Sequence, residues 1–243
     1  MAKLSVNVNK VATLRNTRPL DIPSVLRMSK IALEAGAHGI TVHPRPDQRH
    51  IRPKDVHDLA QLLKAYPTAE FNIEGNPFHD FLHFARDVRP TQCTLVPDTL
   101  AQSTSDHGFD TFAERDRLAP VIAELKGYGC RVSLFVDPDV RAVEGAAALG
   151  ADRVELYTEP YATAFASGDR NAASPYAAAA RRAVELGLGV NAGHDLNLDN
   201  LAPFIAAVPQ TLEVSIGHAM IGDALEFGMA ETVRKYLAAA ASR

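Results

Sequence analysis

Short runs of apolar residues recur along the whole chain, and a segment with helical character follows almost every one of them. Such alternation is typical of βαβ units, in which a helix joins each strand to the next parallel strand. The runs are nearly continuous in Val, Ile and Leu, as expected for strands that are buried on both faces. They predict strands at residues 4–9, 39–43, 70–74, 92–97, 131–136, 153–157, 188–192 and 212–216.

The segments between these strands carry helix signals. Pro53 suits a first helical turn, Asp137-Pro138 suits an N-cap followed by the first helical residue, and Gly36 and Gly150 suit helix C-termini. No glycine-rich turn follows the first strand, where an open dinucleotide-binding sheet would have one, so the pattern predicts a closed (β/α)8 (TIM) barrel. The predicted helices lie at about 23–35, 53–65, 77–88, 113–128, 138–149, 174–187, 198–206 and 219–240.

The length of 243 residues suits one barrel domain, residues 1–243, because such barrels commonly have about 250 residues. Two connections, 98–112 and 158–173, are longer than a barrel needs. Long loops of this kind often act as lids or contain short extra helices, and we expect the same here.

Composition excludes several classes of function. No stretch approaches the apolar length of a membrane span, and the N-terminus lacks the apolar core of a signal peptide. Cys93 and Cys130, the only cysteines, each lie beside a predicted buried strand, so reduced thiols and a cytoplasmic protein are expected. A net charge of −4 gives no basic surface for nucleic acid, so an anionic substrate would need a local basic patch.

Polar residues able to do chemistry stand at the C-terminal ends of six of the predicted strands. In a (β/α)8 barrel these ends converge on one site, to which several strands contribute catalytic residues. The pattern therefore predicts an active site at this mouth of the barrel. The residues are Asn7, Asn9, Lys10, His43, Arg45, Glu74, Glu155, Thr158, His194, Gly217 and His218.

Two regions are suited to bind phosphate. Gly217 and His218 begin a predicted helix, whose free N–H groups and positive dipole end favour an anion. Arginine offers a planar fork of donors that matches phosphate, although a solvated loop arginine is equally common. A basic cluster follows the first two strands and comprises Arg15, Arg18, Arg45, Arg49, His50 and Arg52.

His43, Glu74 and His194 are candidates for proton transfer, since histidine titrates near neutrality and burial raises the pKa of glutamate. Structural, hydrogen-bonded histidines are the alternative. Glu155 suits a site carboxylate or a strut for a basic side chain equally well. Two histidines and a carboxylate also suit a metal site, but no HxH or HExxH spacing supports one.

Eight segments form a combination far more specific than a generic barrel would contain: VNVNKVATLRNTR, AGAHGITVHPRPDQRHI, FNIEG, LVPD, VSLFVD, VELYT, VNAGHDLN and IGHAMIG. In these segments, which extend over nearly the whole chain, the sequence resembles the pyridoxine 5′-phosphate synthase family. The resemblance implies a (β/α)8 barrel with extra helices that assembles into octamers built from dimers. The implied reaction condenses 1-deoxy-D-xylulose 5-phosphate with 3-amino-2-oxopropyl phosphate, giving pyridoxine 5′-phosphate, phosphate and water in vitamin B6 synthesis.

The resemblance also implies roles for individual residues: His43 as general base, Glu74 as acid/base group and His194 as proton donor. The implied chemistry is Schiff-base formation, loss of phosphate, addition of water and aldol-like ring closure, with no redox cofactor and no metal. The implied substrate-binding residues are Asn7, Arg18, Arg45, His50, Thr104, Gly217 and His218. To these we add Asn9, Lys10 and Asp195, which stand at family positions with a different residue type.

The chain departs from the family pattern at a few of these positions. Better-known members have Asp-His in place of Asn9-Lys10 and Gly in place of Asp195, and the segment DTLAQSTSDHG lacks basic residues that many relatives have. We interpret the chain as a variant subgroup that retains the activity. Two alternatives are a metal-dependent sugar-phosphate epimerase or aldolase on the same fold, and a non-catalytic barrel that binds phosphorylated metabolites.

Overall fold

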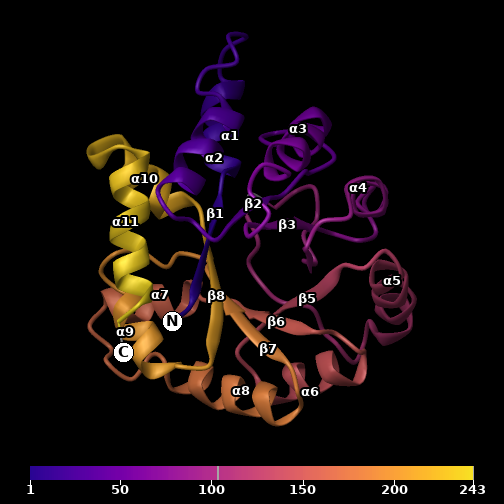
Figure 1. Ribbon diagram of the computed structural model, residues 1–243. Helices are drawn as coiled ribbons and strands as arrows, with labels where there is room; N and C mark the ends of the chain where they lie inside the picture. Colours follow the sequence, from indigo (N-terminus) through magenta and orange to yellow (C-terminus); the bar gives the residue numbers. More distant parts are fainter. Residues whose placement is uncertain (103, 243) are drawn as a thin grey trace.

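The computed structural model of the protein describes residues 1–102 and 104–242. Eight parallel strands pair in sequence order and close into a barrel, which confirms the predicted (β/α)8 fold (Figure 1). The predicted strands all form, with ends that differ by at most two residues. Their bounds are β1 Lys3–Asn7, β2 Gly39–Val42, β3 Glu70–Gly75, β4 Gln92–Leu95, β5 Arg131–Val136, β6 Arg153–Leu156, β7 Gly189–Ala192 and β8 Thr211–Ile216.

The helices form an outer ring around the barrel (Figure 1). Pro53 begins a helix as predicted, and Gly36 and Gly150 follow helix ends with φ of 106° and 79°, a left-handed conformation that glycine adopts easily. The helices are α1 Asn9–Asn16, α2 Val25–Glu34, α3 Pro53–Leu63, α4 Leu82–Val88, α5 Arg115–Gly127, α6 Val140–Ala148, α7 Glu159–Ala166, α8 Ser174–Glu185, α9 Leu201–Ala207, α10 His218–Phe227 and α11 Met229–Ala240.

Three features of this ring were predicted wrongly. Helix α1 was missed; it starts two residues after β1 because the side chain of Asn7 accepts a hydrogen bond from the backbone N–H of Asn9 (3.0 Å) and turns the chain. The N-cap of α6 is Asp139 rather than Asp137, since its carboxylate accepts from the backbone of Arg141. The predicted helix 219–240 is broken by Gly228, whose φ is 77°.

The two long connections differ from each other. Residues 158–173 contain α7, as expected for an extra helix. Within 98–112, the described residues form turns and bends but no helix. Extra helices therefore lie after β1, β6 and β8, where α1, α7 and α10 stand.

Alternation along the strands divides the interior into two layers. Successive side chains of a strand point to opposite faces, so Phe71 and Ile73 of β3 pack against the helices while Asn72 and Glu74 point into the barrel. Asn72 accepts a hydrogen bond from Thr94 there (3.0 Å). The space between sheet and helices is thus apolar, whereas the centre of the barrel is lined by polar side chains.

The floor of the barrel, at the N-terminal ends of the strands, is closed by paired charges. Glu213 is 3% exposed and accepts a hydrogen bond from Arg153 at 3.0 Å, with Arg131 at 3.5 Å. Arg131 also pairs with Glu70, which in turn binds Lys3. Each buried charge here has an opposite partner, so the floor is a closed, fully paired network.

Both cysteines are buried and free, as predicted. No helix within residues 1–102 and 104–242 is long and apolar enough to cross a membrane.

We predict that Glu213→Ala lowers the free energy of unfolding by about 3–5 kcal/mol, because removal of one member of a buried charge network leaves its partners uncompensated. Urea unfolding followed by circular dichroism measures the change. The matched control is Glu231→Ala, which removes the partner of Arg234 from a pair that is 51% and 59% exposed. That change should cost about 0–1 kcal/mol. Equal effects of the two substitutions would contradict a structural role for the floor.

Candidate active site

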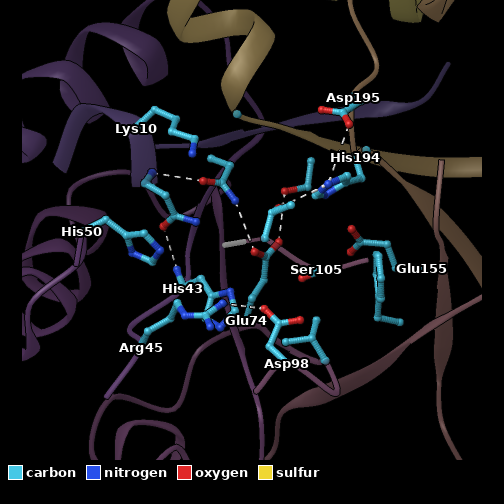
Figure 2. A pocket seen from close by; sticks show the side chains of 18 of the residues that line it. Lys10, His43, Arg45, His50, Glu74, Asp98, Ser105, Glu155, His194 and Asp195 are labelled. Atoms are coloured by element: carbon cyan, nitrogen blue, oxygen red, sulfur yellow. Dashed lines mark hydrogen bonds and ion pairs between the residues drawn. The ribbon is translucent and has the colours of Figure 1, made fainter. Parts of the chain in front are cut away.

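A cavity of about 220 Å³ opens at the C-terminal mouth of the barrel (Figure 2). Thr158, one of the polar residues at the strand ends, does not line it. All but two of the residues predicted to be catalytic or to bind substrate do line it, namely Asn7, Asn9, Lys10, His43, Arg45, His50, Glu74, Thr104, His194, Asp195 and Gly217. The exceptions are Arg18 and His218, which are exposed after α1 and at the start of α10 and do not line the cavity.

Two asparagines tie the first three strand ends together. Asn7 donates from Nδ2 to Oε2 of Glu74 (3.2 Å), linking β1 to β3. Asn9 accepts at Oδ1 from the backbone N–H of His43 (2.9 Å), linking α1 to β2. These neutral side chains therefore position the two groups predicted to exchange protons.

Glu74 combines a desolvated location with negative neighbours. Burial raises its pKa to about 8, with the charges of Asp98 and Glu213 acting in the same direction. Hydrogen bonds from Ser215 (3.5 Å) and Asn7 oppose this only in part. Glu74 therefore holds a proton near neutral pH and is suited to act as an acid as well as a base.

His43 and His50 lie side by side, with ring centroids 6.0 Å apart. Burial holds the pKa of His43 well below its ordinary value, and the positive charges of Arg45 and Arg49 strengthen the effect. Burial and Arg45 likewise lower the pKa of His50 to about 4. Nδ1 of His50 accepts from the backbone N–H of Ile51 (2.9 Å), which leaves the proton on Nε2. Both rings are neutral at physiological pH, and His43 is free to accept a proton.

His194 is held from three sides. Thr158 donates from Oγ1 to its backbone carbonyl (2.6 Å), Tyr157 packs on its ring with centroids 5.5 Å apart, and Oγ1 of Thr104 is 3.4 Å from Nε2. Burial lowers the pKa of His194, while the carboxylates of Asp195 and Asp98 raise it. Burial is the larger effect, so the pKa of His194 stays below its ordinary value, although not as far below it as that of His43.

Arg45 reaches the cavity but is not a free phosphate clamp. Its guanidinium binds Oδ2 of Asp98 at 2.9 Å and the carbonyl oxygens of Thr99 and Gln102, and the pair with Asp98 is almost fully buried. Arg49 donates to the carbonyls of Leu100 and Gln102. Nε of Arg45 has no hydrogen-bond partner among the described residues. The two arginines thus hold the loop that follows β4.

Arg15 and Arg52 of the predicted basic cluster form ion pairs outside the cavity. Arg15 is 4% exposed and pairs with Asp55 at 2.5 Å, which makes it a strut beneath the loop after β2. Arg52 lies near Asp21 at the surface. The prediction of one clamp from six residues was therefore too broad, because sequence proximity to a strand end does not say which way a long side chain turns.

Asp98, Ser105 and Ser215 also line the cavity and were missed as site residues. Asp98 ends the LVPD segment, so a signal was present, but no charge partner could be assigned to it from the sequence. Glu155 lines the cavity as well, 5% exposed, and no described basic residue pairs with it. Of its two predicted roles, the geometry favours a site carboxylate, whose pKa burial and Glu74 raise well above the ordinary value.

Within the described part of the chain, no three His, Cys, Asp or Glu side chains are grouped so as to hold a metal ion.

The model of the family described as "Pyridoxal phosphate biosynthesis protein PdxJ" matches residues 4–242. The chain belongs to the PdxJ family. Curated relatives named pyridoxine 5′-phosphate synthase include one from Albidiferax ferrireducens, 56% identical over 97% of this chain and 96% of its own. Another, from Christiangramia forsetii, is 53% identical over 98% of both chains. A third, from Xanthomonas oryzae pv. oryzae, is 56% identical over 97% of this chain and 95% of its own.

Several solved structures of other enzymes share the fold. Thiamine phosphate pyrophosphorylase from Pyrococcus furiosus superposes with a TM-score of 0.59 at 16% identity, covering 99% of this chain and 97% of its own. Phosphoribosyl anthranilate isomerase from Thermus thermophilus has a TM-score of 0.57 at 14% identity, covering 98% and 97%. At these identities the likeness shows the barrel fold alone.

The raised pKa of Glu74 predicts a pH-dependent stability. Between about pH 4.5 and 8 the folded PdxJ chain keeps a proton on Glu74 that the unfolded chain has lost, so the free energy of unfolding falls as pH rises through this range. We expect Glu74→Gln to flatten this decline and to become more stable relative to the parent as pH increases. Urea unfolding at several pH values measures it.

The control for this experiment is Glu231→Gln, which alters an exposed carboxylate and should leave the slope unchanged. A parallel pH dependence in the parent protein and in Glu74→Gln would mean that Glu74 is ionised in the folded state.

Proposed function

We propose that this cavity is the active site of a pyridoxine 5′-phosphate synthase, which condenses 1-deoxy-D-xylulose 5-phosphate with 3-amino-2-oxopropyl phosphate to give pyridoxine 5′-phosphate, inorganic phosphate and water. The observation that carries the proposal is the convergence of His43, Glu74 and His194 from three strands on one cavity. Relatives with this name are 53–56% identical over almost the whole chain, which favours it over a metal-dependent sugar-phosphate enzyme or a non-catalytic barrel.

The three groups suit the successive proton transfers of this reaction. Schiff-base formation, phosphate loss and ring closure each require protons to be removed from carbon or nitrogen and delivered to departing oxygen. Neutral His43 accepts a proton, and His194 delivers one to a departing hydroxyl. Glu74, with a pKa of about 8, exchanges protons in both directions near neutrality. The substrates themselves supply the amine and carbonyl groups that react.

Two parts of the cavity are suited to the two phosphates. Gly217 precedes α10, a ten-residue helix whose first N–H groups and positive dipole end favour an anion. On the other side Lys10, Arg45 and Arg49 bring positive charge to the wall. For Arg45 to bind phosphate, the anion would take the place of Asp98 on its guanidinium. Arg18 and His218 remain candidates from the resemblance alone.

The cellular location, the domain organisation and the oligomeric state of the protein are also proposals. We infer a cytoplasmic enzyme in which residues 1–243 form one catalytic domain, supported by the two buried free thiols and by the match of residues 4–242 to a single family. Homo-oligomerisation is supported by exposed apolar side chains on and near α1 and α10, among them Leu20, Ile22 and Leu225.

Incubation of the enzyme with both substrates should yield pyridoxine 5′-phosphate, detected by mass spectrometry. We predict that Glu74→Gln folds but loses about 10²–10⁴-fold in kcat, because an amide keeps the size of the side chain but exchanges no proton. The control is Glu231→Gln, which alters an exposed carboxylate of α11 that does not line the cavity. A loss of less than about threefold in Glu74→Gln would assign Glu74 a structural role.

A separate prediction concerns Lys10, which lines the cavity at the start of α1. We expect its ammonium to attract a substrate phosphate rather than to form a Schiff base, since one substrate already carries the reacting amine. Lys10→Arg should retain substantial activity, whereas Lys10→Met should raise KM for one substrate by about tenfold. Borohydride trapping of substrate on Lys10, together with an inactive Lys10→Arg enzyme, would establish the covalent role instead.

A further inference from the structure

We infer that Asp195 is a positioning residue for His194, pairing its carboxylate with the imidazolium so that His194 stands ready to donate a proton. The inference rests on the proposed function, because it assigns Asp195 a part in that reaction. Figure 2 shows the two side chains together at the edge of the cavity, joined by a contact of 3.8 Å between Oδ2 of Asp195 and Nε2 of His194.

The backbone of Asp195 is the first observation that supports this role. Its φ is 60°, in the left-handed region that glycine adopts without strain and other residues seldom adopt. The turn is fixed by Asn200, which donates from Nδ2 to the carbonyl of Asp195 (3.2 Å). Aspartate is one of the few residue types besides glycine that adopt this conformation readily, so the backbone fixes the direction of the Asp195 side chain at little cost.

The direction of the side chain is the second observation. Asp195 lines the cavity although 44% of its side chain is exposed, and among the described residues it forms no other ion pair. Its carboxylate meets the ring edge that also lies 3.4 Å from Oγ1 of Thr104. Oδ2 of Asp195 and Oγ1 of Thr104 therefore both lie beside Nε2 of His194.

The charges around His194 define what the contact does. Burial lowers the pKa of His194 most strongly, and Lys10, facing it from α1, acts in the same direction. Asp195 gives the largest opposing effect, followed by Asp98 from the β4 loop and Glu159 from α7. Phe135 and Tyr157 contribute only apolar ring contacts. Without Asp195, His194 would lose its proton at a lower pH and spend less time as an acid.

The deciding variant is Asp195→Asn. Asparagine adopts the left-handed conformation readily and has nearly the same size, so the fold is kept while the charge is removed. Because burial already holds the pKa of His194 below 6.5, we expect the alkaline fall of kcat to move to lower pH. The loss should be about threefold to tenfold above pH 6.5 and should shrink as the pH falls below that pKa, with KM changed less than kcat. The ring resonances of His194 should titrate at lower pH in the ligand-free protein.

The matched control is Asp80→Asn. Asp80 also has a left-handed backbone (φ 47°) and lies 3.1 Å from a histidine, His83, but neither residue lines the cavity. This variant should leave the pH profile of kcat unchanged. An unchanged profile and an unchanged His194 titration in Asp195→Asn would overturn the inference. A parent enzyme that makes no pyridoxine 5′-phosphate would instead refute the proposed function, and the His194 titration would still report on the pairing.

Discussion

Closure of eight parallel strands forces alternate side chains of every strand into a narrow interior, and the whole site depends on this constraint. Glu74 points inward because it is two residues from Asn72, which already fills the layer below. The same alternation brings Ser215 of β8 within reach of Glu74, although the two residues are far apart in the sequence. A one-residue change in the register of β3 would turn Glu74 toward the helices and leave the cavity without its central acid.

Burial of the cavity residues shifts their pKa values and thereby determines how they exchange protons. Burial raises the pKa of Glu74 and lowers those of His43 and His194, so each group is driven toward its neutral form. Neighbouring charges then separate the two histidines: arginines lower the pKa of His43 further, whereas carboxylates partly offset the effect of burial on the pKa of His194. Two residues of the same type thereby differ in how readily they take up a proton. No single side chain accounts for these differences, because the pKa of each group depends on its burial and on the charges of its neighbours.

The sequence predicted the barrel and most of the cavity because both follow from local order: strand ends must meet, and the polar residues there must share a space. It failed where the answer depended on the path of a flexible side chain or loop. Arg15 and Arg45 occupy similar positions after strands, yet one supports a loop from beneath and the other binds Asp98. Helix α1 was missed because a single side-chain contact from Asn7 ends the strand earlier than its apolar pattern suggests.

Buried glutamates are paired with arginines at one end of the barrel and lack a described cationic partner at the other. At the floor, Glu213 lies between Arg153 and Arg131, so its charge is balanced where nothing needs to react. At the mouth, Glu74 and Glu155 lack a described cationic partner, and burial together with neighbouring carboxylates raises the pKa values of both. Keeping these carboxyl groups protonated lowers the stability of the fold as pH rises, a cost that the paired floor and the apolar layer outside the strands offset. The residues that stabilise the fold through ion pairs and the residues proposed to react therefore lie at opposite ends of the same eight strands.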